Sequence, residues 1–190
     1  RLPRTYRGRD IHWWIEAIGL ADERWNEIAD LARARRVPSP QLAGTPDRRS
    51  CDLNALHAAG VAMVGRIVGV SNGLVQCSGS LANLATNADL KQNRLLDQID
   101  AFAAEAALDD TAPDRPAPTT IGTPATEVSL AGIDTVIWAT GYRPTYPWLD
   151  NALLDSRGQI IHEGGVMAVP GLYAVGLPLL RRRKSSFLDG

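Results

Sequence analysis

Apolar residues recur at the spacing of a helical face in four parts of the chain. Asp10 and Asp52 stand before two of these segments as N-cap residues, and Gly19 follows the first one as a C-terminal stop. The last segment is the longest. The spacing predicts helices over residues 11–18, 21–36, 53–59 and 81–107.

Short apolar runs between these helices predict strands. The pair Asn72-Gly73 favours a two-residue hairpin turn, and the nearly unbroken run 133–139 is typical of a strand buried on both faces. Four prolines within 109–126 predict a linker there. Helices that alternate with strands indicate an α/β fold. The predicted strands cover 61–64, 67–70, 74–77, 133–139, 159–162 and 171–176.

Composition narrows the classes of function. The chain has 20 basic and 21 acidic residues and a net charge of −1, so no overall field attracts nucleic acid or an anionic membrane. Cys51 and Cys77 form no CxxC pair, so the sequence contains no motif for a zinc site or a redox dithiol. Glycine and proline interrupt the apolar stretch 166–180, which is too short for a membrane span. We expect a soluble, reduced, cytoplasmic protein.

The usual catalytic motifs are absent. The sequence has no GxSxG, no HExxH and no Walker loop, and its three histidines form no metal-like cluster. It also has no GxGxxG, so part of any dinucleotide site is expected outside this chain. Arg1 in place of methionine, and a C-terminal segment 185–190 that reads like the start of a helix, suggest a chain cut at both ends.

Two runs carry a resemblance to a known family. Residues 136–144 read VIWATGYRP, and residues 170–176 read PGLYAVG. An aliphatic strand that ends in Ala-Thr-Gly-Tyr, followed by a second strand closed by glycine, resembles the flavin-containing monooxygenases and related flavoproteins that bind two dinucleotides. The resemblance implies a Rossmann-like two-dinucleotide-binding fold, present here in part. Residues 1–130 would be most of an NADPH-binding domain, with a hairpin at 67–77 and a linker at 109–126, and residues 131–190 the C-terminal part of an FAD-binding domain.

The resemblance also implies cofactor contacts. The N-terminal arginines would meet the 2′-phosphate of NADPH, and the ends of the two strands would lie near FAD. Many related flavoproteins have an aspartate after the last strand, whereas this chain has Leu177, so the flavin ribityl chain must be held otherwise. The implied cofactor-binding residues are Arg1, Arg4, Arg7, Ala139, Thr140, Gly141, Tyr142, Gly176 and Leu177.

The implied activity is that of an FAD-dependent oxidoreductase that takes hydride from NADPH, a monooxygenase acting on a small organic substrate with oxygen. Homo-oligomerisation is compatible with this reading, and the isolated chain is expected to be inactive. No catalytic residue and no metal ligand can be named. Two alternatives remain open: a flavoprotein reductase, which the missing CxxC counts against, and a non-catalytic or degenerate nucleotide-binding or interaction domain.

Several charged residues have a simpler interpretation. The basic N-terminal loop is as well explained by solvation as by phosphate binding, and the run 181–184 is expected to be solvated. His12 and His162 are expected at the surface, and no partner is evident for Asp134 or Asp155.

Overall fold

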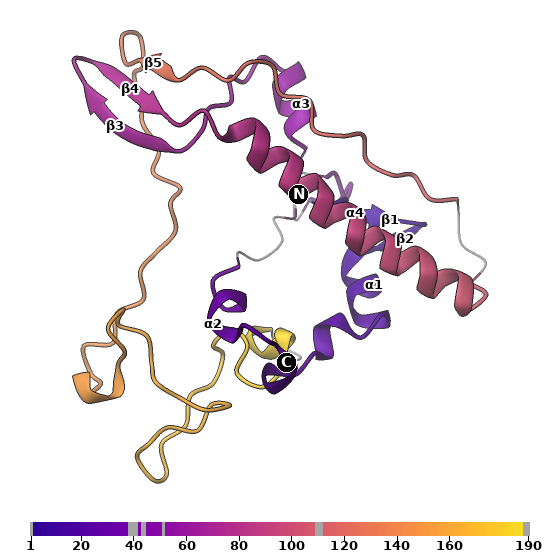
Figure 1. The fold of residues 1–190 in the computed structure, drawn as a ribbon, viewed down its shortest axis with the longest axis vertical. Coiled ribbons are helices and arrows are strands. Elements are labelled where there is room, and N and C mark those ends of the chain that lie inside the picture. Colours follow the sequence, from indigo (N-terminus) through magenta and orange to yellow (C-terminus); the bar gives the residue numbers. More distant parts are fainter. Residues whose placement is uncertain (1, 38–41, 43–44, 51, 109–111, 188–190) are drawn as a thin grey trace. The chain divides into compact units, whose positions relative to one another are not determined.

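The computed structural model describes residues 2–37, 42, 45–50, 52–108 and 112–187 (Figure 1). The chain forms two compact units: unit 1 contains residues 1–14 and 40–136, and unit 2 contains residues 15–39 and 137–190. This grouping differs from a division near residue 130, because the segment 15–39 associates with the C-terminal part of the chain. The assignment of an NADPH domain and an FAD domain stays a prediction.

A long helix dominates unit 1. Helix α4 (Leu81–Glu105) confirms the predicted helix over 81–107, and one of its faces is buried. Strands β1 (Thr5–Tyr6) and β2 (Arg9–Asp10) form a small antiparallel hairpin. Helix α1 (Ile11–Ala17) follows this hairpin and confirms the helix predicted over 11–18. The buried residues of α4 are Ala85, Gln92, Leu96, Ile99 and Ala103.

A three-stranded antiparallel sheet also belongs to unit 1. Its order is β3 (Ile67–Ser71), β4 (Leu74–Cys77) and β5 (Glu127–Ser129), and Figure 1 shows the β3–β4 hairpin as a long ribbon. Asn72 and Gly73 have φ angles of 51° and 72°, as a type I′ turn requires, so the predicted hairpin is confirmed.

The segment before this sheet is only partly as predicted. Helix α3 (Leu53–Ala58) forms, and the Asp52 side chain caps it by accepting a hydrogen bond from the Asn54 N–H at 2.8 Å. The strand predicted over 61–64 is wrong: only Val64 pairs there, in an isolated bridge to Ala125.

Asp100 on α4 joins the N-terminal hairpin to the long helix. The hydroxyl of buried Tyr6 lies 3.0 Å from each Asp100 carboxylate oxygen, Arg7 Nε donates to the same carboxylate at 2.6 Å, and Arg115 also binds it. The Trp14 indole N–H donates to the Tyr6 carbonyl at 2.7 Å. Burial acts to raise the pKa of Asp100, but hydrogen bonds from Arg115, Arg7 and Tyr6 outweigh it and hold this pKa below its usual value.

In unit 2, the helix predicted over 21–36 is wrong. The segment forms two 3₁₀ turns, η1 (Leu20–Asp22) and η2 (Trp25–Glu27), and a short helix α2 (Leu31–Ala34). The Trp25 N–H donates to the Arg181 carbonyl at 3.0 Å, which takes this group out of any local helix. The Asp30 side chain accepts from the Arg33 N–H at 2.8 Å and so begins a new helix after the turns.

The basic run 181–184 was predicted to be solvated, but three of its side chains form ion pairs within unit 2. Arg182 binds Asp22 and Arg183 binds Glu23, while Lys184 lies 2.5 Å from Glu16. These three pairs connect the segment 16–23 to η4 (Arg183–Ser186). This 3₁₀ turn stands where a helix was expected over 185–190, and residues 188–190 lie outside the described part of the chain.

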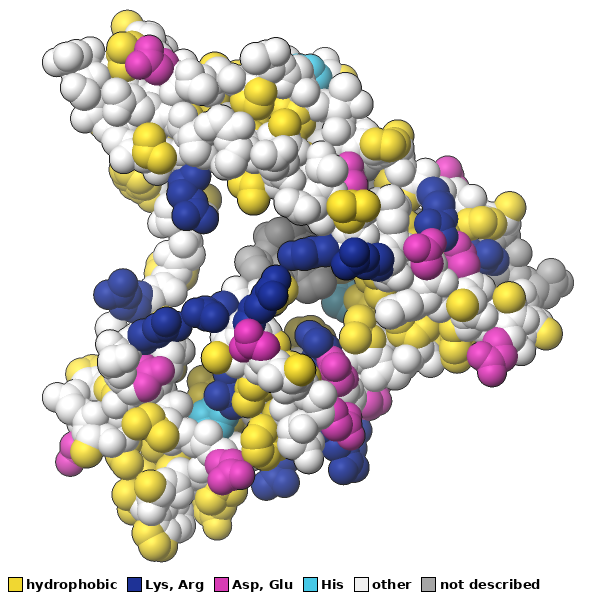
Figure 2. Space-filling view, viewed as in Figure 1, with side chains coloured by type: hydrophobic (Ala, Val, Ile, Leu, Met, Phe, Trp, Pro, Cys, Tyr) yellow, Lys and Arg dark blue, Asp and Glu magenta, His cyan; other side chains and the backbone are white. Residues whose placement is uncertain are grey.

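The strand predicted over 133–139 does not form. These residues have no strand partner in the described part of the chain, and Ile137 and Trp138 are 84% and 77% exposed. A strand buried on both faces needs a neighbour on each side to pair its backbone groups, and a β-rich sequence cannot supply that alone. Figure 2 shows hydrophobic side chains open to solvent on the surface.

The other two predicted strands of unit 2 are reduced to isolated bridges. Ile160 pairs with Leu154, and Tyr173 pairs with Val166. The sheets of the described residues are small and antiparallel, and the Rossmann-like fold stays a prediction. Within the described ranges, every helix falls short of the length and apolar character needed to cross a bilayer.

We expect Asp100→Asn to lower the free energy of unfolding of unit 1 by about 2 kcal/mol, because it removes charged hydrogen bonds from two guanidinium groups and a buried phenol. Urea unfolding followed by tryptophan fluorescence measures this effect, since Trp14 is buried beside Tyr6.

Asp97→Asn is the matched control, because Asp97 lies on the same helix and also binds Arg115, but its side chain is 65% exposed against 22% for Asp100. Its effect should stay below about 0.5 kcal/mol. Equal effects of the two substitutions would contradict the role given to Asp100.

Candidate functional site

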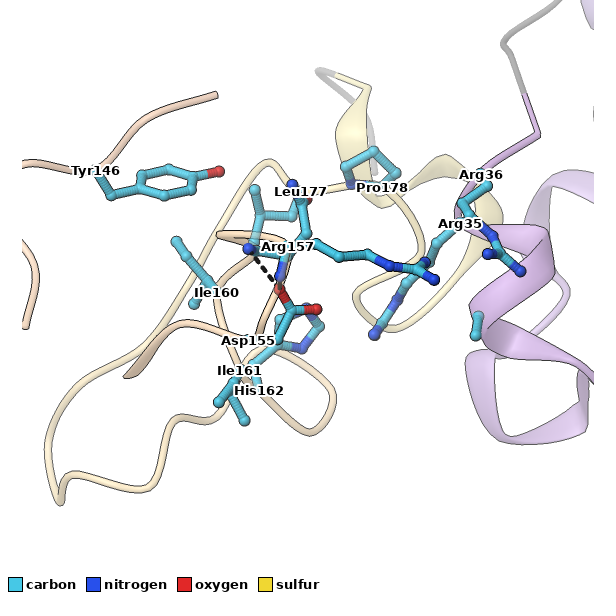
Figure 3. Close-up of a pocket in the computed structure, with 12 residues that line it drawn as sticks. Arg35, Arg36, Tyr146, Asp155, Arg157, Ile160, Ile161, His162, Leu177 and Pro178 are labelled. Carbon is cyan, nitrogen blue, oxygen red and sulfur yellow. Dashed lines mark hydrogen bonds between the residues drawn. The ribbon is translucent and has the colours of Figure 1, made fainter. Parts of the chain in front are cut away.

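Unit 2 contains a cavity of about 540 Å³, a size typical of sites for small molecules (Figure 3). One side is the end of α2, and the other is the turn that leads from Asp155 to His162. We call it the cationic cavity. It is lined by Ala32, Arg35, Arg36, Tyr146, Asp155, Arg157, Gln159, Ile160, Ile161, His162, Leu177 and Pro178.

Asp155 builds the turn that carries Arg157. Its Oδ1 accepts hydrogen bonds from the N–H groups of Arg157 and Gln159, both at 2.8 Å, and these two bonds keep the pKa of Asp155 low. Gly158 has a φ angle of 73°, which a side chain would strain. No partner for Asp155 was evident in the sequence, and the structure shows that this carboxylate accepts hydrogen bonds within its own turn.

Arg35 is the most confined cation of the cavity. It follows α2 and is half-buried, and its Nη2 lies 3.5 Å from the Leu179 carbonyl. Its Nε is buried and has no hydrogen-bond partner in the described part of the chain. No described carboxylate forms an ion pair with it. Burial therefore lowers the pKa of Arg35, although a guanidinium group stays charged at any physiological pH.

His162 is half-buried rather than at the surface, whereas His12 is exposed as predicted. The His162 Nδ1 accepts a hydrogen bond from the Gly165 N–H at 3.2 Å. Burial, and then the charge of Arg35, lower the pKa of His162 below its usual value. The imidazole is thus neutral at pH 7, with its proton on Nε2 as a further donor.

The cavity has an excess of positive charge. Arg35, Arg36 and Arg157 line it with the single carboxylate of Asp155, which leaves a net charge of +2 with His162 neutral. In Figure 3, Arg157 reaches from its turn toward the side where Arg35 and Arg36 lie. An anion is the ligand that this arrangement is suited to bind.

The predicted cofactor residues of unit 2 do not converge on one point. Leu177 lines the cationic cavity, and Gly176 precedes it with a φ angle of 74°. The segment 139–142 does not line the cavity; it is exposed, and Tyr142 is fully so.

The predicted phosphate-binding arginines lie in unit 1 and have partners within it. Arg4 pairs with Asp10 at 2.8 Å, and Arg7 pairs with Asp100 at 2.6 Å. The guanidinium group of Arg9 stacks 4.2 Å from the Trp13 ring centroid, a cation–π contact. Arg1 lies outside the described residues.

Sequence reasoning missed the arginines of the cavity. Arg35 and Arg36 stand at the end of the segment 21–36, where cations suit the dipole of the helix predicted there, and that helix is broken. Arg157 lies in a turn, and no motif of the sequence surrounds it. Their common feature is that none of the three forms an ion pair among the described residues, and only the folded structure shows this.

Part of the chain is similar to proteins named as oxidoreductases. "Uncharacterized oxidoreductase CzcO" of Bacillus velezensis is 46% identical over 59 residues, which cover 30% of this chain and 17% of that protein. The protein of the same name from Bacillus subtilis is 44% identical over 63 residues, or 33% of this chain and 18% of its own length. "Uncharacterized oxidoreductase CzcO-like" of Geobacillus kaustophilus is 46% identical over 59 residues, 30% of this chain and 17% of that protein.

These matches relate about a third of the chain to an oxidoreductase sequence, and they span less than a fifth of each relative. No protein-family model matches the chain. No solved structure matches it either.

The lowered pKa of His162 predicts a loss of stability in mild acid. Because the unfolded imidazole takes up a proton below about pH 6.5, before the folded one does, the free energy of unfolding of unit 2 should fall as the pH drops below about 6.5. In His162→Asn, an amide oxygen replaces the Nδ1 acceptor without titrating, so this fall should shrink. Urea unfolding at several pH values measures it.

His57→Asn is the control, because it removes an exposed imidazole in unit 1 and should leave the fall in place. A fall that is the same in His162→Asn as in the original chain would disprove the role of His162.

Proposed function

We propose that this chain is part of an FAD-dependent oxidoreductase that takes hydride from NADPH and acts as a monooxygenase on a small organic substrate. The observation that carries the proposal is the run 136–144 together with the run 170–176. The relatives named as oxidoreductases support the broader class. The choice of FAD, NADPH and oxygen rests on the resemblance of the two runs to flavin-containing monooxygenases.

The segment 139–142 fits a role in contacting FAD. It is exposed, and in the described part of the chain none of its backbone N–H groups donates to another backbone group. Gly141 has a φ angle of 79°, and a Cβ added there would meet no atom within 4 Å. Small residues and available N–H groups let backbone approach a ligand closely.

The N-terminal arginines fit NADPH less well. A 2′-phosphate at Arg4 or Arg7 would have to displace the carboxylate of Asp10 or Asp100. The Arg7 pair is part of a network that also contains Tyr6, so this displacement would disturb the attachment of the hairpin to α4. The proposal therefore keeps NADPH as the hydride donor without giving its 2′-phosphate to these two residues.

FAD, when bound, supplies the hydride acceptor and the group that reacts with oxygen. The contribution of this chain is to hold FAD and to orient it. Residues 139–142 would present backbone donors, and Leu177 would offer an apolar contact where related flavoproteins have a carboxylate. No acid–base pair is required for this contribution.

The first test is FAD binding by the purified chain, followed by the visible absorption spectrum and by quenching of flavin fluorescence. We expect FAD to bind, and Gly141→Ala to weaken it about tenfold, because a side chain at positive φ costs about 1–2 kcal/mol. Thermal-shift measurements should show stabilisation by NADPH and a smaller effect of NADH.

Gly132→Ala is the matched control, because Gly132 also has a positive φ of 81° and open space around its Cβ position, but lies outside the two runs. It should leave FAD affinity unchanged. Equal weakening of FAD binding by Gly132→Ala and Gly141→Ala would contradict the contact of residues 139–142 with FAD. Failure of FAD, NADPH and NADH to bind would favour a non-catalytic role.

A further inference from the structure

The cationic cavity holds charge that the fold itself leaves uncompensated. Arg35, Arg36 and Arg157 line it with one carboxylate, and the described residues provide no ion pair to any of the three. Three other cations of unit 2 have ion pairs in the described structure: Arg182 with Asp22, Arg183 with Glu23 and Lys184 with Glu16. What distinguishes the cationic cavity is that three arginines without a described ion pair line one cavity.

We propose that the cationic cavity binds a small organic phosphate, with its phosphoryl group between Arg35 and Arg157 and its organic part against the apolar lining. This inference uses no residue of the two runs; Leu177, which follows the second run, is the one lining residue that it shares with the proposed FAD contact.

Arg35 provides the first argument. Its Nε is buried without a hydrogen-bond partner, and the only described hydrogen bond of its side chain is the long one, 3.5 Å, from Nη2 to the Leu179 carbonyl. A half-buried charge with an unsatisfied donor costs free energy that a bound anion would recover. An oxyanion is the natural partner, since a guanidinium group can donate two parallel hydrogen bonds to it.

The charge balance favours phosphate over a carboxylate. The Asp155 Oδ1 is already occupied by the N–H groups of Arg157 and Gln159, so this carboxylate does not neutralise the guanidinium groups directly. The remaining net charge of +2 matches a phosphate dianion, whereas a carboxylate would leave one charge unpaired. The neutral His162 can add a donor through Nε2.

The rest of the lining indicates that the ligand is organic. The cavity, at about 540 Å³, is much larger than inorganic phosphate needs, and five of its lining residues besides Ala32 are apolar or aromatic. Contact with these side chains would add hydrophobic binding energy to the charge term. They are Tyr146, Ile160, Ile161, Leu177 and Pro178.

A second cavity of about 400 Å³ in unit 2 makes a useful comparison. It is lined by Arg24, Trp25, Asn26, Arg181 and Arg182. However, Arg182 is paired with Asp22, and Arg181 Nε donates to the Gly164 carbonyl at 2.9 Å. Two of its three arginines therefore already have partners, so this second cavity is less suited to bind an anion than the cationic cavity is.

The test is isothermal titration calorimetry of the full chain with phenyl phosphate and with inorganic phosphate. We expect phenyl phosphate to bind more tightly. Arg35→Gln and Arg157→Gln should each weaken it at least about tenfold, as expected for the loss of a charged hydrogen bond. Arg157 is exposed on a turn, so its substitution tests the site even if Arg35→Gln disturbs the fold.

Arg33→Gln is the matched control, since Arg33 lies on α2 and is exposed but does not line the cavity. It removes the same charge and should change affinity less than about twofold. If it weakens binding as much as the other two, or if neither phosphate binds, the proposal is overturned.

The same titration distinguishes two sources of the phosphoryl group. Competition of phenyl phosphate by NADP⁺ but not by NAD⁺ would identify the 2′-phosphate of a nucleotide as the ligand group. Binding of phenyl phosphate that NADP⁺ does not displace would identify a phosphorylated small molecule instead. Both outcomes support a phosphate site, and neither depends on FAD binding, so failure here leaves the proposed function to its own test.

Discussion

Ion pairs between the run 181–184 and the acidic residues of 16–23 are the interaction on which unit 2 depends. The two segments are far apart in the sequence, and backbone hydrogen bonds reinforce their contact: the Trp25 N–H donates to the Arg181 carbonyl, and the Arg183 N–H donates to the Glu23 carbonyl. Single exposed ion pairs contribute little, but several that share a contact and are joined by backbone bonds act together. Their combined effect is to bring α2, in the early part of the chain, into the same unit as residues 137–187.

This arrangement explains why the cationic cavity exists. Once α2 is fixed in unit 2, Arg35 is half-buried beside a cavity whose described lining contains one carboxylate, Asp155, which already accepts hydrogen bonds within its own turn. The acids of the segment 16–23 are taken by other cations, so none is left for the arginines of the cavity. The fold thus separates its charges: it pairs them where the two segments meet and leaves them unpaired at the cavity. A protein that gains nothing from this separation would be expected to place a neutral side chain at position 35.

Local features were predictable, and long-range ones were not. The helix 81–105 and the hairpin 67–77 follow from helical spacing and from the Asn-Gly pair, because the information lies within the segment itself. The expected helix over 21–36 breaks because contacts with the C-terminal segment compete with it. The run 133–139 has a high propensity for strand, but a strand needs partners, and the described chain provides none. For the site, the sequence indicated Leu177, but the cavity that it lines unites residues more than a hundred positions apart, which spacing cannot reveal.

The two runs that resemble flavin-containing monooxygenases are proposed to contact FAD. Both are exposed over much of their length in the described structure, so their amide hydrogens should exchange rapidly with solvent in the free chain. The most direct measurement is hydrogen–deuterium exchange by mass spectrometry, with and without FAD. We expect slower exchange within 137–142 and 171–176 when FAD is present, and little change in α4. Unchanged exchange in both runs, at a concentration of FAD that saturates the chain, would contradict it.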